Sequence, residues 1–403
     1  VVGATETGIS FSGSEIKVPA GGSTVVDVFA DIITNSTVAT YASVIDFKGW
    51  SAVGANTGNA ITFTSEQLGQ SVEVSSGPTV TVATGSNTAP NKIVVMGSTN
   101  NELFTIRLSN NGVDDVYFSD LTLYDTITSG ATNKPSFTNI TLYAGGELIG
   151  GPLVMESVSA TTSSVTFALD ATAPLIPKNS SRDIVVKGDV SSISSGGSVS
   201  GSSHVFTVLT DDDIYAGPGS NGAVDATMTG APIYSNTIKV YQTKLSLSSS
   251  VTGATTGRAR TGSDDLATIS FGADSALQLT LGTVSLKFTG NAVTSGTTAF
   301  TVDLIDTNTN AALGSASQAT CTPAAGNSCS VTFYPQFIIS AGDTKAAKVR
   351  VNSSSFNNTA SAGDALSVLI NAASDVQWYD GSSALIPVES TVVPFTVASM
   401  SYE

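Results

Sequence analysis

Charged side chains are scarce in this chain. Only 12% of its 403 residues are Asp, Glu, Lys or Arg, about half the share found in typical soluble domains. This scarcity excludes a coiled coil or a charge-driven disordered tail. Acidic residues outnumber basic ones by 32 to 16, which gives a formal net charge of -16. Such a surface repels a phosphate backbone, so nucleic acid is not an expected partner.

Long apolar runs and catalytic signatures are also missing. No run of 18 apolar residues is present, so no helix is expected to span a membrane. The chain begins Val1-Val2-Gly3, without an initiator Met or an apolar leader, and we expect any signal peptide to have been removed or to lie upstream.

The single histidine, His204, has no acid or nucleophile at a telling spacing. We expect it in a loop or at a strand edge, without a catalytic role. No enzyme is therefore predicted. A secreted polysaccharide hydrolase needs only two carboxylates and remains an alternative that the sequence does not exclude.

Only two cysteines are present, Cys321 and Cys329, separated by a segment that contains Pro and Gly. Strands that turn back on each other bring Cβ atoms close to disulfide range. We therefore predict a disulfide that clamps a hairpin and an oxidising, extracytoplasmic compartment. Two unpaired thiols are the alternative, whereas a zinc site would need further ligands.

Helical patterns are replaced by short alternating segments, such as Thr105–Leu108 and Ser164–Phe167, bounded by Gly, Asn, Ser and Pro. This pattern predicts an all-β fold. The length exceeds what one core supports, so at least two domains are expected. With 38 Gly and few charges, hydroxyls and amides must form most of the polar surface.

One strand-turn-strand unit occurs three times. The turn reads Val18-Pro19-Ala20-Gly21 in the first copy, Ile176-Pro177 in the second and Ile339-Ser340-Ala341-Gly342 in the third. Each copy then continues to a strand that ends in Asp or Asn, at Asp31, Asp189 and Asn352. A second aspartate recurs after each unit and supports the same alignment of the copies, at Asp46, Asp213 and Asp375. The period of about 160 residues is far longer than a solenoid repeat and indicates whole domains.

The register of the repeats sets the domain boundaries. We predict a partial β-sandwich at residues 1–77, and complete sandwiches at 78–241 and 242–403, the last with the disulfide-clamped hairpin. Leu103–Ile106 matches Leu266–Ile269, but the first copy has no counterpart. Either upstream residues or a donated strand of a neighbouring subunit would complete it.

The joints between copies are short, which favours semi-rigid connections. Near the end of the chain, Pro394–Ala398 resembles Pro78–Ala83. This segment is either a closing strand or the start of a further copy.

Acidic clusters in Gly-rich segments are the candidate metal ligands, because Ca²⁺ prefers six to eight hard oxygen ligands. A solvated acidic turn is the alternative. The leading candidates are Asp211, Asp212, Asp213 and Asp225, and weaker ones are Asp114, Asp115, Asp120, Asp264 and Asp265.

Aromatic residues recur shortly after the second recurring aspartate of each repeat, at Trp50, Tyr215 and Trp378. Burial is the expected role of the tryptophans, and stacking on a glycan is the alternative. Five Asn-x-Ser/Thr sequons could accept glycans: Asn35, Asn139, Asn179, Asn352 and Asn357.

The repeated unit resembles the tandem immunoglobulin-like sandwiches of bacterial S-layer and other cell-surface assembly proteins. The resemblance implies an elongated extracellular array, often with Ca²⁺, that assembles with copies of itself. The leading hypothesis is therefore a non-enzymatic structural protein that forms a surface layer or filament, with cell-envelope glycans as further partners. The alternative is an adhesin or carbohydrate-binding surface protein that uses the aromatic loops.

Overall fold

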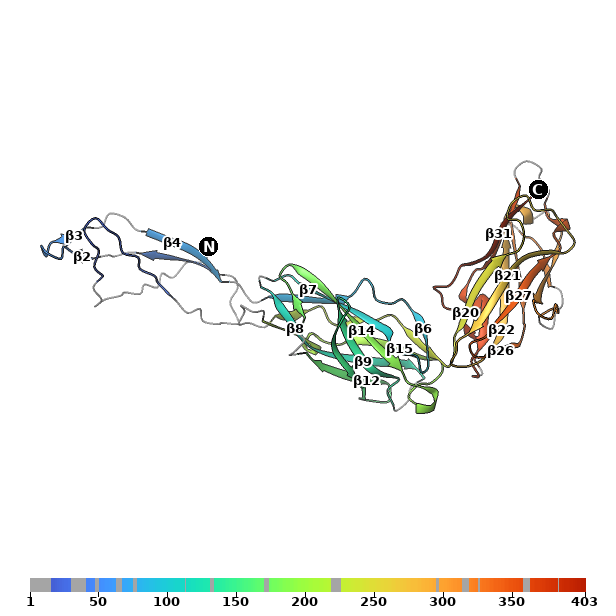
Figure 1. The fold of residues 1–403 in the computed structure, drawn as a ribbon, viewed down its shortest axis with the longest axis horizontal. Helices are drawn as coiled ribbons and strands as arrows, with labels where there is room; N and C mark the ends of the chain where they lie inside the picture. The colour runs from blue at the N-terminus through green and yellow to red at the C-terminus, as the bar shows by residue number, and fades with distance from the viewer. Residues whose placement is uncertain are drawn as a thin grey trace. The chain divides into compact units, whose positions relative to one another are not determined.

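The computed structural model describes residues 16–29, 41–47, 51–62, 67–74, 78–112, 114–130, 134–169, 174–218, 226–294, 297–313, 319–324, 327–357, 363–382 and 384–403. The chain divides into two compact units, Val1–Ser76 and Gly77–Glu403. Nearly all regular structure is β, joined by short 3₁₀ turns (Figure 1). The predicted all-β fold is confirmed. Its immunoglobulin-like topology stays a prediction.

The first unit contains two small antiparallel pairs. Strand β1 (Tyr41–Phe47) pairs with β4 (Gln67–Val74), and β2 (Ala52–Val53) pairs with β3 (Ala60–Ile61). The stretch from Ile16 to Phe29 contains a turn at Ala20–Gly21 but no strand, and its large apolar side chains are exposed, up to 90% at Phe29. Asp31 and Trp50 lie outside the described residues.

The second unit begins with a sandwich of two sheets. The six-stranded sheet has the order β10-β9-β14-β7-β5-β17. Its strands are Glu147–Leu153, Phe137–Ala144, Ser180–Val190, Asn101–Asn110, Thr79–Thr84 and Thr227–Thr229.

The facing sheet follows the order β11-β12-β8-β15-β19-β6. These strands are Glu156–Ser157, Thr162–Ala168, Val116–Ser129, Ser202–Val208, Ile238–Tyr241 and Lys92–Val95. Three short strands extend it, β13 (Leu175–Ile176) and β16 (Ile214–Pro218) beside β8, and β18 (Ile233–Tyr234) beside β15.

A second sandwich follows in the same unit. Its five-stranded sheet has the order β20-β21-β27-β23-β24, formed by Leu245–Val251, Asp264–Ala273, Thr344–Val351, Phe300–Asp306 and Ala319–Cys321. Its seven-stranded sheet runs β30-β29-β22-β28-β31, with β25 and β26 also paired to β22. These strands are Ile386–Pro387, Val376–Tyr379, Leu279–Thr289, Asp364–Ile370, Phe395–Tyr402, Ser328–Phe333 and Phe337–Ile339.

The two sandwiches follow the same plan. Phe104 of β7 lies opposite Val186 of β14, and Ala267 of β21 lies opposite Val349 of β27, each 163 residues further along. All four side chains are fully or almost fully buried. The predicted match between Leu103–Ile106 and Leu266–Ile269 therefore holds in the structure, because both segments fill the same place in a core.

The segment that begins at Pro394 is a closing strand. Phe395–Tyr402 forms β31, which pairs antiparallel with β28 at the edge of the seven-stranded sheet. In the first sandwich, β18 and β19 pair with β15 in the same way. Pro394–Ala398 and Pro78–Ala83 are therefore alike in sequence but not in structural position. The strand β5, which contains Thr79–Ala83, lies in the six-stranded sheet of the first sandwich, whereas β31 lies in the sheet of the second sandwich that corresponds to the facing one.

Candidate functional site

The repeat aspartates act as local caps. Asp213 ends the 3₁₀ turn Asp211–Asp213, and its Oδ2 accepts hydrogen bonds from Thr210 N (2.9 Å) and Oγ1 (3.0 Å). Asp375 ends the turn Ala373–Asp375 and accepts from Asn371 N (2.9 Å) and Ala372 N (2.8 Å). The predicted equivalence of Asp213 and Asp375 is thus explained by their shared capping role.

Asp46 differs from these two residues. It lies within β1, paired with Leu68 beside a register shift. In the two sandwiches of the second unit the capping turns pack on the long strands β8 and β22. No counterpart of those strands is among the described residues of the first unit.

The leading calcium candidates accept hydrogen bonds from different parts of the fold. Asp211 Oδ1 accepts a hydrogen bond from Ala231 N (2.9 Å), and Asp213 Oδ1 accepts one from the Tyr124 hydroxyl (3.2 Å). Asp212 is exposed, and Asp225 lies outside the described residues. Among the described residues, no three His, Cys, Asp or Glu side chains gather into a metal-binding group. Calcium binding stays a prediction.

Asp114 and Asp115, two of the weaker acidic candidates, also accept backbone hydrogen bonds. Asp114 Oδ1 accepts from Asp115 N (2.8 Å), and Asp115 Oδ1 accepts from Lys178 N (2.8 Å). These bonds hold the loop after β7 against the turn before β14. Asp120 lies in β8, opposite Ala168 and Tyr215.

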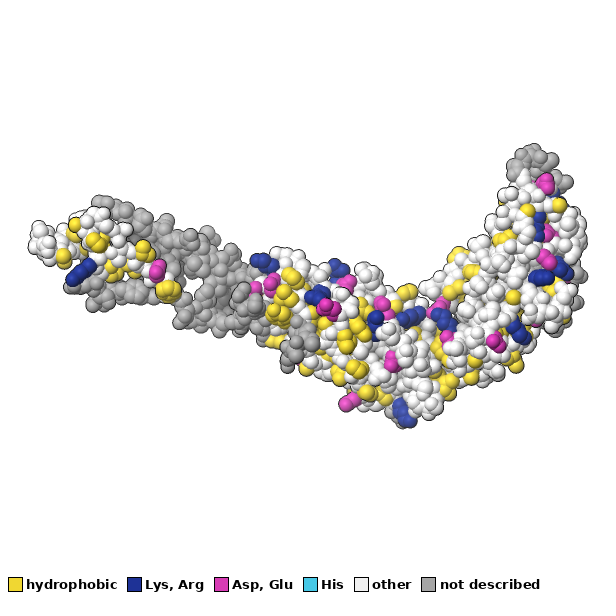
Figure 2. Space-filling view, in the orientation of Figure 1, with side chains coloured by type: hydrophobic (Ala, Val, Ile, Leu, Met, Phe, Trp, Pro, Cys, Tyr) yellow, Lys and Arg dark blue, Asp and Glu magenta, His cyan; other side chains and the backbone are white. Residues whose placement is uncertain are grey.

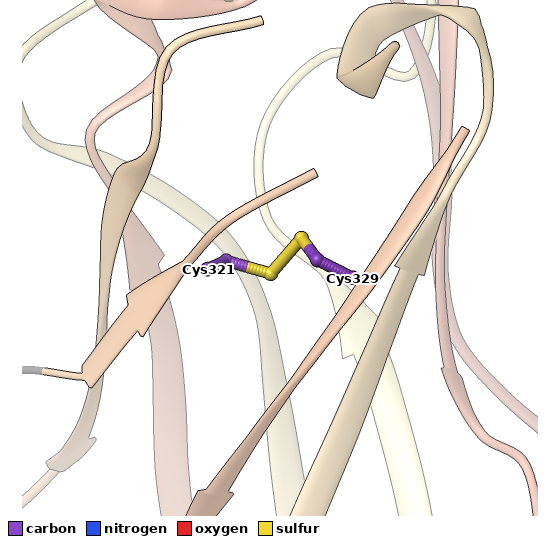
Figure 3. The surroundings of a disulfide bond; sticks show 2 residues. All are labelled: Cys321 and Cys329. Atoms are coloured by element: carbon purple, nitrogen blue, oxygen red, sulfur yellow. A yellow bond between two sulfur atoms is a disulfide. The ribbon is translucent and has the colours of Figure 1, made fainter. Parts of the chain in front are cut away.

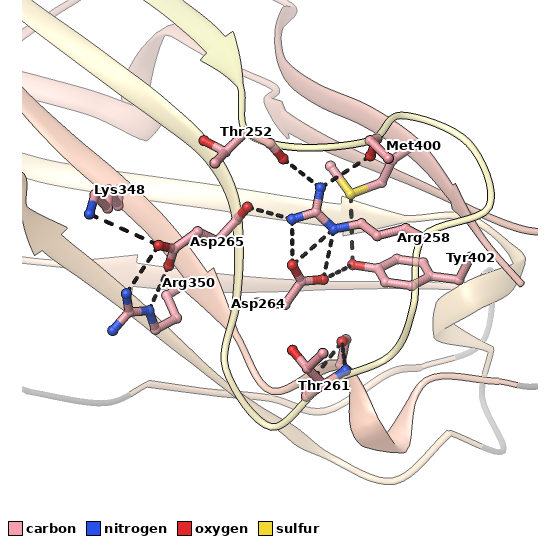
Figure 4. Close-up of polar contacts among 11 residues, drawn as sticks. Thr252, Arg258, Thr261, Asp264, Asp265, Lys348, Arg350, Met400 and Tyr402 are labelled. Atoms are coloured by element: carbon pink, nitrogen blue, oxygen red, sulfur yellow. Dashed lines mark hydrogen bonds and ion pairs between the residues drawn. The ribbon is translucent and has the colours of Figure 1, made fainter.

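Asp264 belongs to a buried network at the end of the second sandwich (Figure 4). Arg258 Nε lies 2.9 and 3.0 Å from the two carboxylate oxygens, and the Tyr402 hydroxyl donates to Oδ2 at 2.8 Å. The hydrogen bond to Asp264 raises the pKa of Arg258, and burial raises that of Tyr402. This network fixes the loop after β20 to the last strand.

Asp265 points away from Asp264 and pairs with Arg350, as Figure 4 shows. Arg350 Nε donates to Oδ1 at 2.6 Å and Nη2 donates to Oδ2 at 3.1 Å. The hydrogen bond from Arg350 lowers the pKa of Asp265. Both carboxylates are thus committed to arginines.

The prediction that His204 lies in a loop or at a strand edge is wrong. His204 is fully buried in β15, between β8 and β19. Its Nδ1 lies 2.9 and 3.0 Å from the Asp125 carboxylate oxygens, and its Nε2 lies 2.9 Å from Ser202 Oγ. Sequence spacing missed the contact because β8 and β15 are paired across 79 residues.

The order Asp125–His204–Ser202 has the connectivity of a catalytic triad, but its setting is that of a core. All three side chains are 0% exposed, so no substrate reaches Ser202. The Phe137 ring lies edge-on to His204 at 5.0 Å between centroids. Buried polar groups of this kind are satisfied by one another, which stabilises a single packing arrangement.

Burial of Trp378 is confirmed, since it is 0% exposed. It therefore cannot stack on a glycan, which removes one of the three aromatics on which the adhesin alternative depended. Tyr215 is 37% exposed, and Trp50 lies outside the described residues.

The predicted disulfide is present (Figure 3), with a Cα–Cα distance of 5.7 Å between Cys321 and Cys329. Its role differs from a clamp on paired strands. Cys321 lies on β24 of the five-stranded sheet, whereas Cys329 lies on β25 beside β22. The bond therefore ties the two sheets together at one corner of the sandwich.

The sequons differ in their surroundings. Asn139 is exposed, but its Nδ2 donates to Asp189 Oδ2 at 2.8 Å. These residues line a surface depression of about 270 Å³. Asn179 is exposed in the turn between β13 and β14. Asn352 and Asn357 are half-buried, and Asn35 lies outside the described residues. Glycan attachment stays a prediction.

Within the described ranges, no helix is long and apolar enough to cross a membrane. No family model matches the chain, and no curated protein matches it.

Several solved structures are similar at low level. The C-terminal domain of the Streptococcus pyogenes antigen I/II-family protein AspA is 8% identical, covering 81% of this chain and 99% of that one, with a TM-score of 0.20. The collagen adhesin CNA from S. aureus is 10% identical, with coverages of 80% and 90% and a TM-score of 0.17.

Red sea bream transglutaminase is 11% identical over 75% of this chain, with a TM-score of 0.24. The chain spans only 31% of that enzyme. At these TM-scores none of the similarities carries a functional argument, and function is argued from the chain's own residues.

Proposed function

We propose that this chain is a non-enzymatic, extracellular structural protein that assembles with copies of itself into a cell-surface layer or filament. The observation that carries the proposal is the tandem repetition of one sandwich plan, matched residue for residue at the Phe104–Val186 and Ala267–Val349 pairs. Repeated rigid modules suit a spacer or lattice element, because each module adds length without adding a new site.

The surface supports the same proposal. On the described part of the surface in Figure 2, most atoms are backbone or side chains that are neither charged nor hydrophobic, with Lys, Arg, Asp and Glu side chains scattered among them. Such a surface stays solvated without depending on pH. The disulfide between Cys321 and Cys329 favours an oxidising, extracellular location.

Titratable groups support a structural role as well. The acid–base constellation nearest to a catalytic geometry, Asp125–His204–Ser202, is fully buried. The carboxylates of Asp264 and Asp265 are occupied by arginines. These groups stabilise the fold and offer nothing to a substrate.

The test is assembly of the purified chain, followed by sedimentation velocity and negative-stain electron microscopy with Ca²⁺ and with chelator. Ordered sheets or filaments support the proposal, and their loss with chelator would add the predicted calcium dependence. A chain that stays monomeric in both conditions and binds members of a glycan array would overturn it in favour of the adhesin alternative.

A further inference from the structure

The two sandwiches of the second unit share apolar side chains at their joint. Ile93 of β6 and Tyr241 of β19 belong by sequence to the first sandwich, yet both pack in the hydrophobic core of the second. They are only 9% and 8% exposed. The Tyr241 ring meets the buried Trp378 edge-on, with 5.8 Å between centroids. The core of the second sandwich therefore extends across the connection.

Asp380 joins the same region by hydrogen bonds. This side chain is 0% exposed and follows β29, two residues after Trp378. Its Oδ2 accepts from Ser200 Oγ in the first sandwich and from Gln242 N in the connecting segment, the latter at 3.2 Å. Its Oδ1 accepts from Ser382 N at 3.0 Å.

The pKa of Asp380 agrees with this geometry. Burial alone would raise the pKa, but hydrogen bonds from Ser200, Ser382 and Gln242 outweigh burial and hold it below its usual range. The carboxylate is therefore held in its charged, accepting form at neutral pH.

Glu389 makes a second contact of the same kind. Its Oε1 accepts a hydrogen bond from Ile93 N at 2.5 Å, and its Oε2 lies 2.7 Å from Lys244 Nζ. The Glu389 side chain is 10% exposed. Two carboxylates of the second sandwich thus hold backbone N–H groups of β6 and of the connecting segment.

We infer that Asp380 and Glu389 form a latch that locks the two sandwiches of Gly77–Glu403 into one cooperative folding body. Connections between domains are usually small and polar, and relative motion is their default. Here a buried ring pair and a shared apolar side chain are combined with two charge-assisted contacts, which are stronger than neutral ones. The inference does not depend on whether copies of the chain assemble.

The experiment measures hydrogen exchange in the full chain as denaturant is raised. Core amides of β7 and β14 report on the first sandwich, and those of β21 and β27 report on the second. In the wild type we expect both sets to lose protection at one denaturant concentration. In D380A/E389A we expect the single midpoint to split into two, with the second sandwich opening first.

The matched control is E147A/E156A, which removes two exposed carboxylates from short or edge strands of the first sandwich. It should leave a single midpoint. If D380A/E389A fails to fold, E389A alone serves, because Glu389 is the less buried of the two. Two separate midpoints in the wild type, or one undivided midpoint in the latch variants, would overturn the inference.

Discussion

The two sandwiches fill the same end of their cores with opposite chemistry. In the first, Asp125 and His204 lie against Phe137. In the second, Phe288 stands 163 residues after Asp125 and contacts Phe300, which stands 163 residues after Phe137. One backbone plan therefore accepts either a satisfied polar group or an aromatic cluster, provided that the volume is filled and every polar atom has a partner.

In the second sandwich the aromatic rings form a continuous chain of contacts from Phe288 to Tyr402. Phe300 meets Phe356 at 4.9 Å between centroids, and Phe356 meets Tyr402 at 5.2 Å, in edge-to-face geometry. The Tyr402 hydroxyl in turn donates a hydrogen bond to Asp264. The second sandwich thus has its polar group at the rim of the core, whereas the first has it inside.

The largest expected effect comes from removing one member of the buried polar group Asp125–His204–Ser202 in the first sandwich. Asp125→Ala leaves the His204 ring buried without its acid, which we expect to lower the free energy of unfolding of Gly77–Glu403 by about 3 to 5 kcal/mol. Denaturant unfolding followed by hydrogen exchange at β8 and β15 measures it.

The control for this variant copies the second sandwich. D125F/H204L/S202A introduces the residues found at Phe288 and at Leu366, which holds the place of His204 in β28. It also removes the buried Ser202 hydroxyl, which would otherwise lose its His204 partner. The variant should recover most of the loss, because replacing all three polar side chains removes the desolvation penalty. A loss as large as that of Asp125→Ala would show that the two cores are not interchangeable.

The disulfide gives the next largest effect, and it lies entirely within the second sandwich. C321A/C329A frees a loop spanning a sequence separation of 8 residues, which we expect to lower the free energy of unfolding of Gly77–Glu403 by about 2 to 3 kcal/mol. Thermal unfolding with and without reductant is the measurement. The variant itself should no longer respond to reductant, since the chain has only 2 cysteines.

A smaller effect is expected at the rim of the second core. Tyr402→Phe keeps the ring contacts but leaves Asp264 with one donor fewer, at an expected loss of about 1 to 2 kcal/mol. Phe356→Leu tests the ring contact separately. If Tyr402→Phe were neutral, Arg258 alone would satisfy the carboxylate.

Much of this fold could be predicted from the chain itself. Alternation of apolar residues gave the β class, and the spacing of Asp213 and Asp375 gave two equivalent copies, because turn capping needs an acid at a fixed place. The cysteine spacing gave the disulfide. Local patterns sufficed wherever the structural cause was itself local.

The sites were less predictable, because their partners are distant in sequence. Asp125 and His204 meet through strand pairing, which no spacing rule reveals. Acidic neighbours such as Asp264 and Asp265 look like one ligand cluster in sequence, but successive residues of a strand point to opposite faces. The burial of Trp378 at a joint depends on Tyr241, whose role emerges only when both sandwiches are present.

The last prediction sharpens the comparison at the surface. Arg107 lies opposite Asp183 in the first sandwich, and Asp265 lies opposite Arg350 in the second, with the charges exchanged between strands. The closest contact in the first pair is 3.4 Å, whereas the second pair is bidentate at 2.6 and 3.1 Å. We expect Arg350→Ala to lower stability by up to about 1 kcal/mol at neutral pH, and Arg107→Ala by less.

The acid dependence of that effect has a definite sign. Arg350 lowers the pKa of Asp265 in the folded state, so the stabilisation is complete above the ordinary Asp pKa of about 3.9 and is lost as pH falls below it. The difference between wild type and Arg350→Ala should therefore shrink below about pH 4 and in high salt. A difference that stayed constant with both pH and salt would mean that Arg350 stabilises β27 through the packing of its alkyl chain and not through its charge.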